Sequence, residues 1–170
     1  MKSEDLRKQL DAARARLLVA IAGVTEEQFK RTPEPLPDDP QPWSIAENLS
    51  HVLAIERTWA QRIALTLTEE RPEILPSPPE AHAEGAAAGR RAPVPQLIHG
   101  LLASRREVER SLDNLADERL ARTAWHPRLG QHLTIEWMLQ KILEHENEHC
   151  LQIEALRRRL GSETVEKSAG

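Results

Sequence analysis

Apolar positions recur along most of this chain with the period of an α-helix. They lie three and four residues apart in four segments, at residues 4–22, 44–67, 94–116 and 135–160. This spacing places the apolar side chains on one helical face and the charged side chains on the other. Since no segment alternates with the two-residue period of a strand, the pattern predicts an all-α fold, a four-helix bundle.

Local signals place several helix ends. Ser44 followed by Glu47 three residues later forms a capping box at the start of the second helix. A similar box predicts a short helical turn over 26–31. Gly161 follows the last apolar position of the fourth helix and is expected to end it, which leaves 162–170 as a frayed polar tail.

Two long connections join the four segments. Residues 69–93 are rich in proline and glycine and predict a mobile loop that can cross the length of a bundle. His82 within that loop is expected to be solvated. Residues 117–133 form the second connection. Because neither half of the chain closes a core alone, residues 1–170 are expected to form a single helical bundle domain.

Composition and charge narrow the classes of function. The net charge is −4 and the pI is about 6.0, so no basic surface for nucleic acid is indicated. No apolar run approaches the ~18 residues of a membrane span, and the first five residues are too polar for a signal peptide. The single cysteine fits a reducing compartment. These features predict a cytoplasmic protein.

The fourth helix carries a pair of histidines, His145 and His149. Residues four apart are neighbours on one helical face, so two imidazoles can share one ion. Both fall on the apolar stripe of the helix, beside Ile142. Buried imidazoles need partners, and a metal ion is one way to supply them.

The string His145-Glu146-Asn147-Glu148-His149 also matches the HExxH helix of zinc proteases. That mechanism needs a third ligand downstream and, in most such enzymes, a sheet edge that binds substrate. Glu154 is too close to the pair, the later acids lie in the tail, and no sheet is predicted. The pattern therefore argues against a protease.

Two other residues on helical faces invite a functional interpretation. Glu56 falls on the apolar stripe of the second helix, where a carboxylate is rare unless paired. It is either a neighbour of the metal site or the partner of an arginine on another helix, and the second alternative is favoured. Cys150 points about 100° away from His149 and is expected to be a packed core thiol.

The histidines lie within a longer pattern. Trp43-Ser44-x-Ala46-Glu47-x-Leu49-x-His51, with Glu56 five residues later and His145-x-x-x-His149-x-x-Gln152-Ile153 near the C-terminus, resembles the DinB/YfiT-like superfamily. The resemblance extends over essentially the whole chain. It implies a four-helix bundle whose helix order departs from simple alternation. It also implies a divalent ion, often zinc or nickel, held by His51, His145 and His149.

The resemblance further implies chemistry with low-molecular-weight thiols such as bacillithiol or mycothiol. Three neutral nitrogens leave a coordination position open, which is typical of catalytic zinc sites. We expect the metal to activate a thiol cofactor that attacks a small electrophile. Glu56 and Glu146 are candidate catalytic residues that orient ligands or move a proton, and His99 or His132 is expected to line the mouth.

A second class of function stays open at this point. A metal-stabilised helical module that binds a partner, or forms a homodimer, would need no catalysis. In that case Arg157-Arg158-Arg159 either meets an acidic partner or forms a solvated helix end. The enzyme alternative, a thiol transferase or hydrolase acting on a small molecule, requires an open coordination position. A site closed by Glu56 or Glu146 would indicate the structural role.

Overall fold

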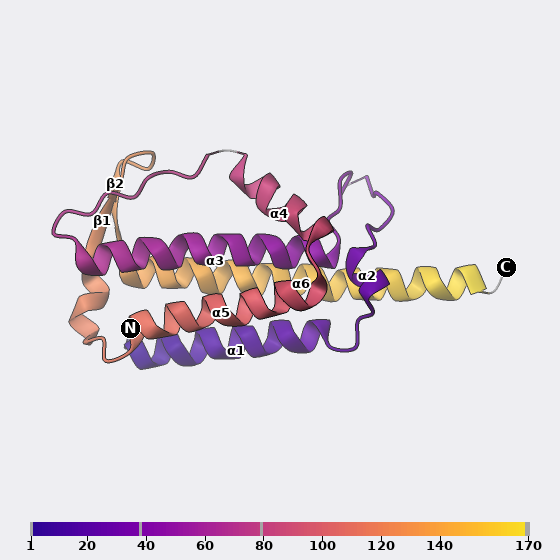
Figure 1. Cartoon of the computed structure of the whole chain (residues 1–170), viewed down its shortest axis with the longest axis horizontal. Helices are drawn as coiled ribbons and strands as arrows, with labels where there is room; N and C mark the ends of the chain where they lie inside the picture. Colours follow the sequence, from indigo (N-terminus) through magenta and orange to yellow (C-terminus); the bar gives the residue numbers. More distant parts are fainter. Residues whose placement is uncertain (1, 38, 79, 169–170) are drawn as a thin grey trace.

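The computed structural model describes residues 2–37, 39–78 and 80–168, with side chains described up to Gly161. Four long helices lie side by side along the long axis (Figure 1). They are α1 (Ser3–Ile21), α3 (Ile45–Thr68), α5 (Val94–Leu112) and α6 (Ile135–Ser168). The predicted four-helix bundle is confirmed.

The helix order is not a simple up-and-down alternation. α1 and α6 run in one direction, and α3 and α5 run in the other (Figure 1). Because α3 and α5 are parallel and consecutive long helices, the chain between them must return along the whole bundle. The long connection over 69–93 makes this return.

That connection contains a helix that the sequence did not predict. α4 (Ala81–Arg91) lies along α3, so the expectation of a wholly mobile loop is wrong for these residues. Gly89 allows the close approach, since a Cβ there would lie 2.3 Å from the carbonyl oxygen of Ala46. Arg90 adds an ion pair of 2.6 Å to Glu47, and Lys30 donates to the Gly89 carbonyl at 2.7 Å.

Replacing Gly89 with alanine should therefore push α4 away from α3. We expect the free energy of unfolding to fall by about 1–3 kcal/mol, as for other overpacked sites. Urea denaturation followed by circular dichroism measures the change. Gly161→Ala is the matched control, because a Cβ there meets nothing within 4 Å, and a helical Gly→Ala change stabilises by up to ~1 kcal/mol. Equal stability of Gly89→Ala and wild type would contradict the close packing.

The second connection holds a small hairpin, so the expectation of no strands is also wrong. β1 (Thr123–His126) and β2 (Gln131–Thr134) pair in antiparallel register, with Ala124 opposite Leu133. Both of those side chains are buried in the core. Strands of four residues offer too few positions for a period of two to be recognised. A 3-10 helix, η1 (Asp117–Ala121), precedes the hairpin.

Two predicted helix starts are confirmed, and one predicted helix end is wrong. α2 (Glu26–Lys30) begins at the predicted capping box, and α3 begins at the box of Ser44 and Glu47. α6, however, continues past Gly161 to Ser168, so the predicted helix end and frayed tail are wrong within the described residues. The arginine run at 157–159 consequently lies inside the helix rather than at its end. Residues 169 and 170 lie outside the described part of the chain.

The core has two apolar clusters with a charged layer between them. On each long helix, one or two buried polar residues separate the residues of the first cluster from those of the second. On α1, for example, Arg14 lies between Leu10 and Leu17, and on α3 Glu56 lies between Val52 and Ala60. The described helices include none that is long and apolar enough to cross a membrane.

Candidate metal centre

Three histidines meet where α3 and α6 pack together. His51 comes from α3, and His145 and His149 come from α6. One ring nitrogen of each lies within 4.8 Å of the others, and the ring centroids are 4.5–5.0 Å apart. Imidazole binds zinc at ~2.0–2.1 Å, so nitrogens this close can share one ion. Since α3 and α6 are antiparallel, the first turns of α3 meet the part of α6 just before its midpoint.

Two of the three rings are oriented by neighbouring acceptors. His149 Nδ1 lies 2.8 Å from Asn48 Oδ1, and His51 Nδ1 lies 3.3 Å from the carbonyl oxygen of His82. These oxygens only accept, so in this arrangement both Nδ1 atoms carry the proton and each Nε2 presents a lone pair. Asn48 is itself fixed, because its Nδ2 donates to the Ser44 carbonyl at 3.0 Å.

Burial keeps these imidazoles neutral. It lowers the pKa of His145 to about 3 and that of His149 to about 4, with the neighbouring imidazoles adding to the effect. Burial also lowers the pKa of His51. A cation would therefore meet three unprotonated donors at neutral pH. This donor set fits a divalent transition metal, since imidazole nitrogen suits zinc and nickel.

A cavity of about 650 Å³ opens beside the three histidines. Trp43 forms part of its wall, with its ring stacked at 6° on His149 at a centroid distance of 6.2 Å. Gln152 and Arg159 line it further along α6. A catalytic site needs such an open side, because three protein ligands leave room for water or substrate.

The histidine at the mouth of this cavity is not one of the two that were expected there. His82 lines it, 5.5 Å from His51 between ring centroids, although its ring is exposed as predicted. His99 and His132 do not line the cavity, so that expectation is wrong. His132 lies in the hairpin with its ring 5.2 Å from that of Trp125. Sequence reasoning could not place His82, because α4 was not predicted.

The two candidate catalytic carboxylates lie in the charged layer of the core. Arg14 bonds Glu146 at 2.5 Å and Glu56 at 2.9 Å, and Arg105 bonds Glu56 at 2.7 Å and also Glu146. Ser104 donates to Glu56 as well. Four side chains from four helices thus form a closed ring of ion pairs. The arrangement favours the ion-pair alternative for Glu56.

Glu56 is held in its ionised form by this ring. Burial favours the neutral acid, but Arg105 and Arg14, with the Ser104 hydroxyl, outweigh it and hold the pKa of Glu56 below its ordinary value. A carboxylate that is ionised and bound by two guanidinium groups is poorly suited to move a proton. The catalytic role of Glu56 and Glu146 stays a prediction, and the geometry supports positioning of α3 and α6 instead.

Cys150 is buried as expected and is not among the residues that line the metal cavity. Its Sγ donates to Glu154 at 3.7 Å, and burial raises the pKa of the thiol to about 11. Since the thiolate is the reactive form, folded protein at pH 8 should react with iodoacetamide far more slowly than protein in denaturant. Mass spectrometry of alkylated samples measures both rates. Equal rates would contradict a packed thiol.

Known proteins share this fold. One similar structure is YfiT from Bacillus subtilis, which is described as a probable metal-dependent hydrolase with an unusual four-helix bundle topology. The TM-score is 0.77 and the sequence identity 24%, and the match covers 94% of this chain and 87% of YfiT. A mycothiol-dependent maleylpyruvate isomerase is similar with a TM-score of 0.72 and 13% identity. That match covers 90% of this chain and 61% of the isomerase. A comparison with curated proteins gives no match.

A conserved protein from Enterococcus faecalis is also similar, with a TM-score of 0.63 and 21% identity, over 95% of this chain and 99% of that one. At these identities the likenesses show a shared fold. The family profile described as the DinB superfamily matches residues 9–153, which include all three histidines and both candidate carboxylates. The chain belongs to the DinB superfamily.

Proposed function

We propose that this protein is a divalent-metal-dependent enzyme that uses a small thiol to attack a small electrophile. His51, His145 and His149 would hold the metal, with zinc or nickel as the ion. The observation that carries the proposal is that three neutral imidazoles converge on a cavity of about 650 Å³. A closed structural site would instead have a fourth protein ligand.

The residues of the chain supply the geometry for this chemistry. Asn48 and the His82 carbonyl orient the ligand rings, and Trp43 covers one side of them. A divalent ion bound there would lower the pKa of a coordinated thiol, so that the thiolate is present at neutral pH. In a transfer reaction the thiol proton passes to solvent and a sulfur–carbon bond forms. The leaving group departs with the electrons of the bond that breaks.

The structural neighbours support this kind of enzyme. One neighbour is described as metal-dependent and another as mycothiol-dependent. The non-catalytic alternative receives less support, because Glu56 and Glu146, the two carboxylates that were expected to close a structural site, bind Arg14 and Arg105 instead. Hydrolysis by metal-bound water is a second candidate, favoured by the description of YfiT.

Cobalt substitution separates these candidates. We expect the visible spectrum of the cobalt(II) protein to gain a sulfur-to-cobalt charge-transfer band when L-cysteine is added. L-serine, which carries a hydroxyl in place of the thiol, is the matched control and should leave that region unchanged. No spectral change at saturating L-cysteine, with one equivalent of cobalt bound, would contradict a thiol-binding metal and leave the hydrolase as the better candidate.

A further inference from the structure

A second cavity, of about 280 Å³, lies next to the metal cavity. It is formed by α3, the hairpin, the start of α6 and the connection that precedes α4. Two arginines, a buried histidine and two tryptophans are among its lining residues: Arg62, Arg128, His126, Trp59 and Trp137. His82 lines both cavities, so they adjoin each other.

The partners of Arg62 among the described residues are neutral. Its guanidinium carbon lies 4.5 Å from the ring centroid of Trp59. Its Nη2 donates to the Leu75 carbonyl and to Ser77 Oγ, each at 3.1 Å. Arg62 is half-buried, and this partial removal from water lowers the pKa of its guanidinium group.

Arg128 brings a second positive charge to the same place. Its Nη2 donates to the Ser77 carbonyl at 2.8 Å, so both arginines bond to one residue. Repulsion from Arg128 adds to the effect of burial on the pKa of Arg62. The described residues that line this cavity include no carboxylate.

His126 supplies a further donor. Its Nδ1 accepts a bond from the Leu129 amide at 3.3 Å, so Nε2 carries the ring proton. Burial first, and then Arg62 and Arg128, lower the pKa of His126, so the ring is neutral and does not add to the repulsion. Among the described lining residues, the cavity therefore holds two guanidinium groups and an imidazole N–H but no carboxylate.

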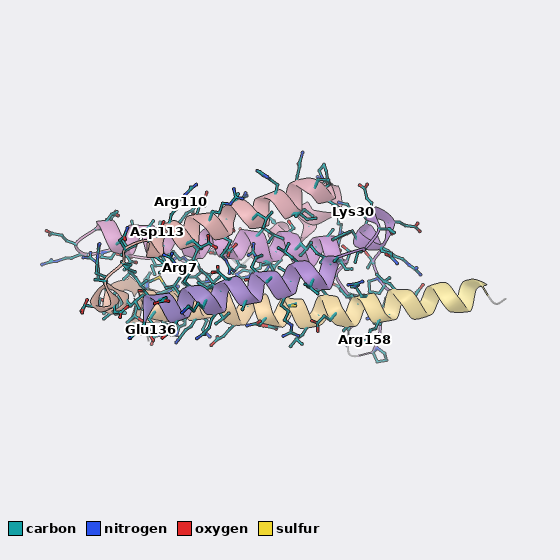
Figure 2. The ribbon with its side chains drawn as sticks, turned by 90° about the horizontal axis from the view of Figure 1, so that it is seen from below. Arg7, Lys30, Arg110, Asp113, Glu136 and Arg158 are labelled. Atoms are coloured by element: carbon teal, nitrogen blue, oxygen red, sulfur yellow. The ribbon has the colours of Figure 1, made fainter. Side chains whose placement is uncertain are left out.

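Another arginine-rich hollow on the protein does not share this imbalance. Between α1 and α5, three arginines line a hollow together with three acidic residues: Arg7, Arg106, Arg110, Asp11, Glu109 and Asp113. Arg7 and Asp113 form an ion pair of 2.8 Å there, and Figure 2 shows Arg110 on the same face. Excess positive charge thus distinguishes the second cavity, of about 280 Å³, from this hollow.

We propose that this second cavity is a binding site for a small oxyanion, a phosphate or carboxylate group, held by Arg62, Arg128 and His126. Guanidinium groups bind both kinds of oxyanion through paired N–H donors. Trp59 and Trp137 pack edge to face at an interplanar angle of 74° and provide an apolar surface for the remainder of a ligand that carries such a group. This site does not depend on the proposed thiol chemistry.

Isothermal titration of the metal-loaded protein with inorganic phosphate, and separately with acetate, tests the proposal at constant ionic strength set with chloride. Wild type should bind one equivalent of at least one of the two anions, and the stronger one identifies a tetrahedral or a planar oxyanion site. Arg128→Gln should weaken that binding about ten-fold or more while keeping the metal content of wild type. Arg110→Gln, in the balanced hollow, should bind like wild type.

Three results would overturn the proposal. The first is equal anion binding by wild type and Arg128→Gln, and the second is no binding by wild type. The third is loss of anion binding in metal-free His51→Ala with retention in Arg128→Gln, which would place the anion on the metal. Thermal unfolding gives an independent readout. Phosphate stabilises proteins slightly because it is excluded from their surface, and this effect is the same for both proteins. Specific binding should raise the Tm of wild type more than that of Arg128→Gln.

Discussion

Arg105→Ala is expected to lower the free energy of unfolding by about 3–5 kcal/mol, because it leaves two buried carboxylates with one arginine between them. Arg105 is 3% exposed and bonds both Glu56 and Glu146, while its other nitrogen donates to the Leu10 carbonyl. A loss of this size is a large part of the ~5–15 kcal/mol stability of an ordinary domain. Urea denaturation followed by circular dichroism measures the change.

Arg110→Ala is the control for this prediction, since Arg110 lies on the same helix but is exposed. A second test keeps the prediction meaningful if Arg105→Ala does not fold. Replacing Arg14, Glu56, Arg105 and Glu146 together with apolar residues of similar volume should be better tolerated than removing one charge, because no uncompensated charge remains. A stable Arg105→Ala protein, within ~1 kcal/mol of wild type, would contradict a closed ring of buried ion pairs.

The second large effect concerns the metal ligands. His51→Ala, His145→Ala and His149→Ala should each lower metal affinity by at least about a hundred-fold, because each removes one of three nitrogens. Asn48→Ala removes only the acceptor that orients His149, and loss of such an outer partner typically costs ~10–100-fold. Competition with a chromophoric chelator measures all four affinities, and helicity by circular dichroism confirms that each variant folds.

Two other histidines serve as controls for that series. His99→Ala should bind metal like wild type, since His99 is exposed on α5 and lies outside the cavity. His82→Ala should also retain affinity, because the atom that accepts from His51 is a backbone oxygen. Loss of metal from His82→Ala, with affinity kept in His51→Ala, would exchange the roles assigned to these two residues.

The charged layer and the metal site are close along the chain. Glu146 follows His145 directly, and Glu56 lies five residues after His51. The ring of ion pairs therefore fixes α3 against α6 about one turn from the ligands. Apolar residues of similar volume would stabilise the core equally well. We therefore infer that the ion pairs serve to fix the register between α3 and α6, the two helices that carry the ligands.

The sequence predicted the long helices because each carries an apolar stripe over several turns, and the capping boxes placed the starts of α2 and α3. The sequence did not reveal α4, because its alanines and glycines form no apolar stripe. Its packing against α3 depends on a glycine, since Gly89 has no Cβ to collide with the backbone of Ala46. The prediction ended α6 too early because a glycine is tolerated inside a helix at a cost of only ~1 kcal/mol.

For the candidate site, helical spacing paired His145 with His149, and the family resemblance added His51. The surroundings of these residues could not be predicted, because they depend on contacts between distant segments. Asn48 meets His149 only when α3 and α6 are antiparallel, and His82 reaches His51 only through α4. Glu146 lies on the same helix as the ligand pair, but the arginines that bind it come from α1 and α5.

The metal content of untagged protein, after reconstitution with zinc or nickel and removal of free ion, is the most direct test of a metal site at His51, His145 and His149. We expect close to one equivalent in wild type and none in His145→Ala, with unchanged helicity in both. An absence of bound metal in the reconstituted wild type would contradict this expectation, as would full occupancy in the variant.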